Sequence, residues 1–498
     1  MNAAWRAEGI GQMGKLTNQQ PQEVFRYFEE ICAIPHGSGN TRQISDYLAG
    51  FAKELGLRYL QDACGNVIIW KDGTAEYENS PAVMLQGHMD MVCEKEPGCP
   101  LDLARDGLQL RLEDGIISAE GTTLGGDDGI AVAYALAILA SDTIPHPPLE
   151  AVFTVDEEIG MLGAAALDTA PLRAKYMLNI DSEDEGVLLV SCAGGTTAVC
   201  HLPVVRETAE GVPAVLSVSG CLGGHSGVEI DKGRANATQV LGRILCRISR
   251  AADFRIVSAD GGKKDNAIPA ESSAELLFEK DADWVRLRSL AEEVNRELQA
   301  EYAATDPGIV VRLEAEGKEL STPAQALTRE STRALITALY GLPGGIQRMS
   351  FDIEGLAQTS LNMGILETDG DEVRMSFSVR SSVESEKQEL VSRMECLMRS
   401  LGGNVTHSGD YPAWEYQKES RLRSLMAAVF EEQYGHQPVI QAIHAGVECG
   451  LFAGKMPGLD CVSFGPDMKD IHTPRETMDV ASAARTWDYL LEVLRRLR

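Results

Sequence analysis

Apolar residues recur with a helical period near the start of the chain. The positions that follow the i, i+3, i+4, i+7 spacing of a buried helix face are Val24, Tyr27, Phe28 and Ile31, so we predict helix within residues 20–60. From Val67 onward the pattern changes to short, unbroken apolar runs such as VIIW, AVMLQ, LEAVFTV and KYMLNI, separated by helix-like stretches such as GIAVAYALAILASD. Apolar strands alternating with helices are typical of an α/β protein whose largely parallel sheet is covered on both faces.

Between residues 197 and 410 the pattern indicates two successive rounds of β/α/β/β/α/β type. The first round contains PAVLSVSG, GRANATQVLGRILCRIS, FRIVSADG, SSAELLFEK, DWVRLRSLAEEVNRELQAEY and GIVVRLEAE. In the second, a predicted helix over AQALTRESTRALITALY precedes strands LAQTSLNMGI and VRMSFSVR, helix ESEKQELVSRMECLMRS and strand NVTHS. Such rounds resemble paired split-βαβ units. We therefore predict one discontinuous α/β domain, 1–196 and 411–498, interrupted by an α+β insertion, 197–410.

The charge balance of the chain limits the classes of binding partner that can be expected. The 498 residues carry 45 Lys and Arg against 74 Asp and Glu, a formal charge of −29. Nucleic acid and anionic membranes are polyanions that need a basic patch, so neither is expected as a partner. Cations remain as candidates.

The cysteines and the apolar runs predict a cytoplasmic location. Eleven scattered cysteines form no CxxC pair, which favours reduced thiols over a disulfide framework. The first fifteen residues lack the apolar core of a signal peptide. The longest apolar run, 130–140, is shorter than the roughly 20 residues of a membrane span.

Side chains of the metal-ligand type follow four predicted strands. They are His88 and Asp90 in LQGHMD, Glu157 and Glu158 in FTVDEE, Asp181 in MLNID, and His472 in VSFGPDMKDIH. Asp127 and Asp128 open the helix that follows GG in GGDDGI. Each alone has an ordinary explanation as a hydrogen-bonded loop, a solvated charge or a helix cap. Because ligands bind at the carboxyl ends of strands in open α/β sheets, their joint occurrence predicts a metal site.

The residue types suit a pair of divalent ions. Two ions roughly 3.5–4 Å apart need a shared carboxylate, for which we predict Asp127. Asp90 is placed to accept the second N–H of His88 and to fix its tautomer. Glu157, next to the ligand Glu158, is the predicted general base.

The motifs GHMDMV, GGDDGI, DEEIGMLGA, NIDSEDEG, GGHSGVEIDKGRANA, HAGVECGLF and FGPDMKDIHTPRE resemble the M20 family of metallopeptidases, and within it the branch of aminoacyl-histidine dipeptidases. The resemblance implies one metal held by His88, Asp127 and Asp181 and a second held by Asp127, Glu158 and His472. It also implies a zinc-peptidase-like catalytic domain with a lid domain, the latter matching 197–410.

The resemblance extends to the substrate. It implies that His225 stabilises the oxyanion and that Asn266 and Arg380 grip the terminal carboxylate, whereas Glu448 is a candidate partner for the α-amino group. Two residues depart from the family pattern, Asp128 in place of Asn and Arg475 in HTPRE. Their effect on metal choice and on side-chain preference stays open.

We therefore predict an enzyme that hydrolyses Xaa-His and other dipeptides with two divalent metal ions, Zn²⁺ in the first place and Co²⁺ or Mn²⁺ as alternatives. A metal-bound hydroxide would attack the peptide carbonyl, with Glu157 as base. The alternatives are an M20 tripeptidase or N-acyl amino acid deacylase and, from another class, a non-catalytic metal-binding protein. The expected partner is a short peptide. A homodimer and a monomer are both open, because two lid rounds in one chain can mimic the pairing of two lids.

Overall fold

The computed structural model of the chain describes residues 14–315 and 323–498, so the predicted absence of a signal peptide falls largely outside the described residues. The chain divides into two compact units. The first comprises the chain up to Ser191 together with Tyr416–Ala442 and Val447–Arg498, and the second comprises Cys192–Glu415 and Ile443–Gly446. None of the described helices is both long and apolar enough to cross a bilayer.

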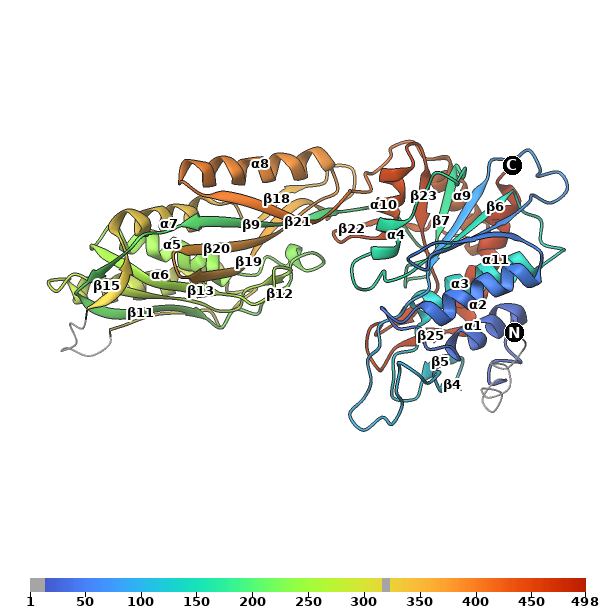
Figure 1. The fold of residues 1–498 in the computed structure, drawn as a ribbon, viewed down its shortest axis with the longest axis horizontal. Helices are drawn as coiled ribbons and strands as arrows, with labels where there is room; N and C mark the ends of the chain where they lie inside the picture. The colour runs from blue at the N-terminus through green and yellow to red at the C-terminus, as the bar shows by residue number, and fades with distance from the viewer. Residues whose placement is uncertain (1–13, 316–322) are drawn as a thin grey trace. The chain divides into compact units, whose positions relative to one another are not determined.

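The first unit is built on an eight-stranded mixed sheet (Figure 1). In spatial order its strands are β1 (Arg58–Gln61), β2 (Val67–Lys71), β6 (Leu149–Thr154), β3 (Val83–His88), β7 (Tyr176–Asn179), β23 (Asp460–Ser463), β8 (Val187–Cys192) and β22 (Val439–Ile443). The four strands β6, β3, β7 and β23 run parallel, whereas β1, β2 and β8 pair antiparallel with their neighbours. The predicted α/β sheet is confirmed as a mixed one, with parallel pairing among its four central strands.

Helices cover both faces of this sheet. They are α1 (Gln22–Cys32), α2 (Arg42–Glu54), α3 (Gly126–Ala140), α4 (Leu162–Ala166), α9 (Arg421–Tyr434), α10 (Glu448–Lys455) and α11 (Val480–Arg496). Adjacent residues of a strand point to opposite faces. Gln86 contacts α10, and a Cβ at Gly87 would meet α3, so these two helices lie on opposite faces of β3. Residues 126–139 of α3 are all buried, as expected for a helix that is apolar on every side.

The loop that bears His472 connects two strands of a small sheet in the first unit. Its strands are, in order, β24 (Met468–Lys469), β25 (Thr477–Asp479), β5 (Ile116–Ala119) and β4 (Leu110–Glu113). Met468 pairs with Met478 and Lys469 with Thr477, so residues 470–476 form a hairpin loop.

The second unit contains a nine-stranded sheet in which every described pairing is antiparallel. In order, its strands are β16 (Val310–Ala315), β11 (Val212–Ser219), β15 (Ser272–Phe278), β13 (Phe254–Gly261), β19 (Ala357–Asp369), β20 (Glu372–Ser381), β9 (Gly194–Pro203) and β21 (Asn404–Tyr411), and β18 (Gly345–Met349) pairs with β19. The helices are η1 (Ile230–Lys232), α5 (Ala237–Ile248), α6 (Trp284–Glu301), α7 (Arg329–Gly341) and α8 (Glu384–Ser400). The remaining strands form two short ladders, β10 (Arg206–Ala209) with β17 (Ala324–Leu327) and β12 (Gly224–His225) with β14 (Ala267–Ile268).

This sheet consists of two β-α-β-β-α-β rounds. In β11-α5-β13-β15-α6-β16 the strands lie in the spatial order fourth, first, third, second, and the same order recurs in β9-α7-β19-β20-α8-β21 when it is counted from β21. The first strand of the second round is β9, so the first round is inserted between β9 and α7. The sheet begins at Gly194, before the predicted boundary at 197.

One predicted helix starts later than expected. The segment AQAL is the strand β17, which pairs with β10, and α7 begins only at Arg329. The side chain of Thr328 accepts a hydrogen bond from the Ser331 N–H and thereby caps the helix.

Candidate metal centre

The carboxyl ends of the central strands bring the predicted ligands to one edge of the sheet. His88 is the last residue of β3, and Glu158 and Asp181 follow β6 and β7 within four residues. In the parallel ladders His88 pairs with Thr154, and Gln86 with Asn179, so these strands end at the same level.

Asp127 lies between two imidazoles. Its Oδ1 is 3.0 Å from Nε2 of His88, and its Oδ2 is 3.1 Å from Nε2 of His472. The carboxylate is 8% exposed and precedes the regular part of α3, because Asp127 and Asp128 have non-helical backbone angles. Each oxygen of one carboxylate thus serves a different histidine, which is the arrangement expected of a bridging ligand.

A second carboxylate lies beside each imidazole. Asp181 Oδ1 is 3.7 Å from His88 Nε2, and Glu158 Oε1 is 3.0 Å from His472 Nε2. A single N–H cannot donate to two carboxylates with good geometry, and the buried Glu158 Oε1 accepts no hydrogen bond from any described residue. A divalent cation can take several such donors at once.

The donor set therefore fits divalent cations. Ligand atoms of His88, Asp127 and Glu158 lie within 4.8 Å of one another, and so do those of His88, Asp128 and Asp181. Imidazole nitrogen and carboxylate oxygen are the ligands of catalytic zinc and of related divalent ions.

The charges at the centre are strongly coupled. The carboxylates of Asp127 and Glu158 beside its ring raise the pKa of His472 to about 10. Burial alone would raise the pKa of Asp127, but its hydrogen bonds with His472 and His88 outweigh burial and lower it. Without cations, the imidazoles are thus the positive partners of the carboxylates.

Asp90 connects His88 to the loop that follows β6. Its carboxylate accepts hydrogen bonds from the Glu157 N–H at 3.0 Å, the Glu158 N–H at 3.4 Å and the Ser38 hydroxyl at 2.8 Å. His88 Nδ1 is 2.9 Å from the Asp90 backbone carbonyl and 3.6 Å from its carboxylate Oδ1. The nearest acceptor for the second imidazole N–H is therefore the carbonyl, and the carboxylate holds the neighbouring loop.

Glu157 lies next to this cluster. Burial is the main cause that raises its pKa to about 9, and the nearby negative charges of Asp181, Glu448 and Glu158 add to it. Within the described chain its carboxylate accepts no hydrogen bond. A carboxylate with this environment can hold a proton and release it.

Asp128 is not an exposed helix cap. It is fully buried, and its Oδ2 accepts the backbone N–H of His88 at 3.1 Å. A Cβ at Gly87 would lie 2.4 Å from this oxygen, so only glycine fits there. Burial and then the charge of Asp181 raise the pKa of Asp128 well above the usual value. Arg475, the other departure from the family pattern, is exposed and lies 4.0 Å from Asp470.

The second unit brings His225 and Asn266 together. His225 pairs with Ala267 in the β12-β14 ladder, and the carbonyl of Asn266 accepts a hydrogen bond from the Ser226 N–H at 2.9 Å. His225 Nδ1 accepts the N–H groups of Gly227 and Val228 at 3.1 and 3.2 Å, while burial and the charge of Arg380 lower the pKa of the ring. The neutral ring therefore carries its proton on Nε2, for which the described residues provide no acceptor.

Arg380 has no carboxylate partner among the described residues. Its Nη1 donates to the Tyr411 hydroxyl at 3.1 Å, and its Nε is buried without a partner. Its positive charge also acts on His444, which sequence reasoning missed and whose Nε2 is 2.7 Å from the Ser360 hydroxyl. Burial, with the Arg380 charge, lowers the pKa of His444 to about 3. The HAG of HAGVECG was the available signal.

Glu448 differs from its predicted role. It is fully buried, and its Oε2 accepts hydrogen bonds from Gln86 at 2.5 Å and from the Thr154 hydroxyl at 2.7 Å. In this conformation the carboxylate is not accessible to a substrate ammonium group. Sequence reasoning also missed Glu476, which lies four residues after His472.

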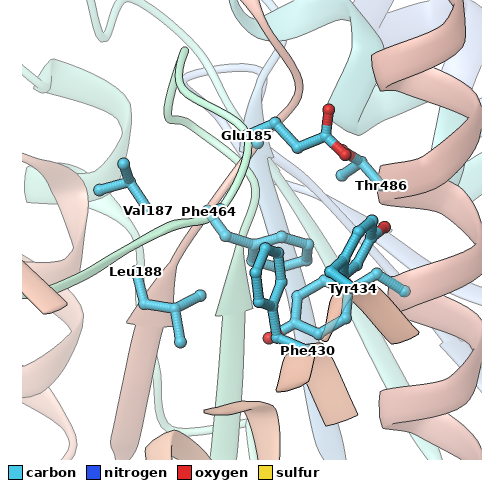
Figure 2. A pocket seen from close by; sticks show the side chains of 10 residues that line it. Glu185, Val187, Leu188, Phe430, Tyr434, Phe464 and Thr486 are labelled. Atoms are coloured by element: carbon cyan, nitrogen blue, oxygen red, sulfur yellow. The ribbon is translucent and has the colours of Figure 1, made fainter. Parts of the chain in front are cut away.

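The first unit also contains a small cavity, which is a packing gap. It lies between aromatic side chains of α9 and α11 and the strand β8 (Figure 2). Its volume is about 10 Å³, and Phe430 and Tyr434 stack in its wall with ring centroids 4.3 Å apart. Such a volume holds about one water molecule and no peptide.

The chain is similar to known proteins over nearly all of its length. The family model of Peptidase family M20/M25/M40 matches residues 84–496. The chain is 35% identical to the cytosol non-specific dipeptidase of Escherichia coli (strain K12) over 97% of its own length and 99% of the relative's. The aminoacylhistidine dipeptidase from Vibrio alginolyticus superposes with a TM-score of 0.91 at 34% identity, covering 97% of this chain and 98% of that one. The aminopeptidase PepT from Bacillus cereus, at 18% identity and a TM-score of 0.55 over 96% and 99% of the chains, shares the fold.

Proposed function

Since the chain belongs to peptidase family M20/M25/M40, we propose that it is a dipeptidase that works with two divalent metal ions. The main support is the position of Asp127, whose two carboxylate oxygens each contact a different imidazole. The names of the relatives, a cytosol non-specific dipeptidase and an aminoacylhistidine dipeptidase, support dipeptides as substrates and Xaa-His among them. The first name also supports a cytoplasmic location.

His88, Asp127 and Asp181 would hold one ion, and Asp127, Glu158 and His472 the other. When bound, such ions lower the pKa of water towards 7 and polarise the peptide carbonyl. We propose Zn²⁺, with Co²⁺ and Mn²⁺ as alternatives, because the donor set contains both imidazole and carboxylate.

The chain's own groups would move the protons. The Glu157 carboxylate accepts a proton from the attacking water and delivers it to the nitrogen of the leaving amine. Asp90 keeps the Glu157 backbone in place through its 3.0 Å hydrogen bond. Glu157 would thus transfer protons, whereas the adjacent Glu158 would hold an ion.

The second unit would contribute donors to the substrate. In the described part of the chain the Nε2–H of His225 has no acceptor, so it could donate to the oxyanion. Arg380 lacks a carboxylate partner among the described residues and would bind the terminal carboxylate, with Asn266 beside His225 as a further contact. Glu448 would support Gln86 and Thr154 rather than bind the α-amino group.

The test is a substrate panel. The purified protein is freed of metal with a chelator and then assayed on dipeptides, tripeptides and N-acyl amino acids with Zn²⁺, Mn²⁺ or Co²⁺. Metal-dependent turnover of dipeptides, Xaa-His included, is expected. Preference for tripeptides or N-acyl amino acids would favour the alternative enzymes, and no turnover would favour a metal-binding protein. Sedimentation of the same protein distinguishes a homodimer from a monomer.

A further inference from the structure

Glu476 is a buried carboxylate that binds the backbone around Asp127. It is 3% exposed and lies at the end of the hairpin loop 470–476. Its Oε2 accepts the N–H groups of Leu124 and Gly125 at 2.8 and 3.1 Å. Its Oε1 accepts those of Gly126 and Asp127 at 2.8 and 3.4 Å. Four consecutive backbone donors thus converge on one side chain.

The local sequence is suited to this contact. The N–H groups at the start of a helix have no partner within the helix, and an anion there is favoured by the helix dipole. Gly125 has a φ of +67°, and a Cβ on Gly126 would lie 3.3 Å from Glu476 Oε1 and 3.0 Å from Met468 Sδ. The two glycines before Asp127 therefore allow the backbone to surround the carboxylate.

Glu476 also shares a loop with a second ligand. His472 precedes it by four residues, and the Glu476 N–H donates to the Thr473 carbonyl at 3.1 Å, which closes the turn between them. The loop that carries His472 is therefore attached to the backbone that carries Asp127. Oδ2 of Asp127 and Nε2 of His472 lie 3.1 Å apart.

We propose that Glu476 is a positioning residue of the metal centre, which fixes Asp127 relative to His472 and thereby raises the affinity for the ions. The inference rests on the proposed metal-dependent function. Glu476 is not itself a ligand, because its two oxygens are occupied by backbone N–H groups. Groups that orient ligands typically change metal affinity 10–100-fold when they are replaced.

The chain offers a matched control in Glu150. This residue is also 3% exposed, and its carboxylate accepts the N–H groups of Arg173 and Ala174 at 2.9–3.0 Å and the Trp70 indole N–H at 3.3 Å. It lies at the start of β6, whereas Glu158 follows the end of that strand. Replacing Glu150 removes comparable bonds away from the ligands.

The experiment compares Glu476→Gln and Glu150→Gln with the unchanged protein. Gln keeps the volume but replaces one acceptor with an NH₂ group that cannot accept backbone donors. Zn²⁺ affinity is measured by competition with a chromophoric chelator, and the unfolding temperature is measured for each metal-free protein. We expect both variants to unfold at lower temperature, but only Glu476→Gln to bind Zn²⁺ about 10–100-fold more weakly.

Unchanged Zn²⁺ affinity in Glu476→Gln, or equal weakening in Glu150→Gln, would overturn the inference. If Glu476→Gln does not fold, Glu476→Asp keeps the charge but is shorter by one methylene and cannot reach both pairs of donors. Unchanged affinity in Glu476→Asp would then overturn it. Failure of the unchanged protein to bind Zn²⁺ would instead count against the proposed function.

Discussion

Replacing Glu157 with Gln removes a proton acceptor and conserves the side-chain volume. General acid–base catalysis contributes about 10²–10⁴-fold, which corresponds to roughly 3–5 kcal/mol of activation free energy. We therefore expect kcat for dipeptides to fall by this factor. Since the carboxylate has no hydrogen-bond partner within the described chain and is not a proposed ligand, both ions should remain bound.

The same substitution should stabilise the metal-free protein. The pKa of Glu157 rises from 4.5 to about 9 on folding, chiefly through burial. For an acid shifted upward, the cost to stability is absent below pH 4.5, grows as the pH rises and is complete near pH 9. At pH 7 the interval above 4.5 corresponds to at most about 3 kcal/mol. Gln carries no such cost, so the variant gains up to this amount.

Two assays examine this reasoning. Dipeptide turnover and metal content are measured after reconstitution, and denaturant unfolding of the metal-free proteins is measured between pH 5 and pH 8. The exposed Glu54→Gln is the control for the loss of one negative charge. Near-normal hydrolysis by Glu157→Gln would refute the role as base. A difference in stability that does not grow with pH would refute the raised pKa.

Three other predictions address the centre and the substrate. In Asp127→Asn only one oxygen remains to bridge, so elemental analysis should find fewer than two ions per chain, and two ions would contradict the bridge. The pKa of His472 is about 10 without cations, and the carboxylates of Asp127 and Asp181 raise the pKa of His88 well above its usual value despite burial. Binding of the ions at pH 7 should therefore release protons. Calorimetry in buffers of different ionisation enthalpy detects this release, and a heat that is independent of buffer would argue against it. Arg380→Ala should raise KM about 10–150-fold for free dipeptides, as expected from a lost charged hydrogen bond, but not for dipeptide amides, and equal effects on both would exclude the carboxylate contact.

The central strands of the first unit were predictable because buried parallel strands are apolar throughout. The runs that became β3, β6 and β7 needed no partner to be recognised. Residues 324–327 were not predictable in this way, since their sequence AQAL suits a helix and only pairing with β10 makes it a strand. The role of β9 as first strand of the second round could not be predicted either. Its two neighbours in the sheet lie more than 150 residues later in the chain.

Residues at strand ends were likewise accessible to sequence reasoning, whereas their contacts were not. Either the carboxylate or the carbonyl of Asp90 could face His88, depending on the turn after β3. The residue types in this segment do not specify that turn. Glu448 opens α10 in a glycine-flanked segment, which indicates an accessible loop, yet Gln86 and Thr154 on β3 and β6 bury it. Burial of a polar side chain is set by partners that are distant in sequence.

The neighbours Asp127 and Asp128 show where this limit comes from. They are identical in type and adjacent, but imidazoles on both sides lower the pKa of the first, whereas burial beside Asp181 raises that of the second. The backbone angles at the start of α3 turn one carboxylate towards His88 and His472 and the other towards the His88 backbone. At this point of the chain Glu476, almost 350 residues away, accepts hydrogen bonds from the N–H groups of Gly126 and Asp127. The turn at which the two side chains diverge is therefore contacted by a residue that lies outside the GGDDGI motif.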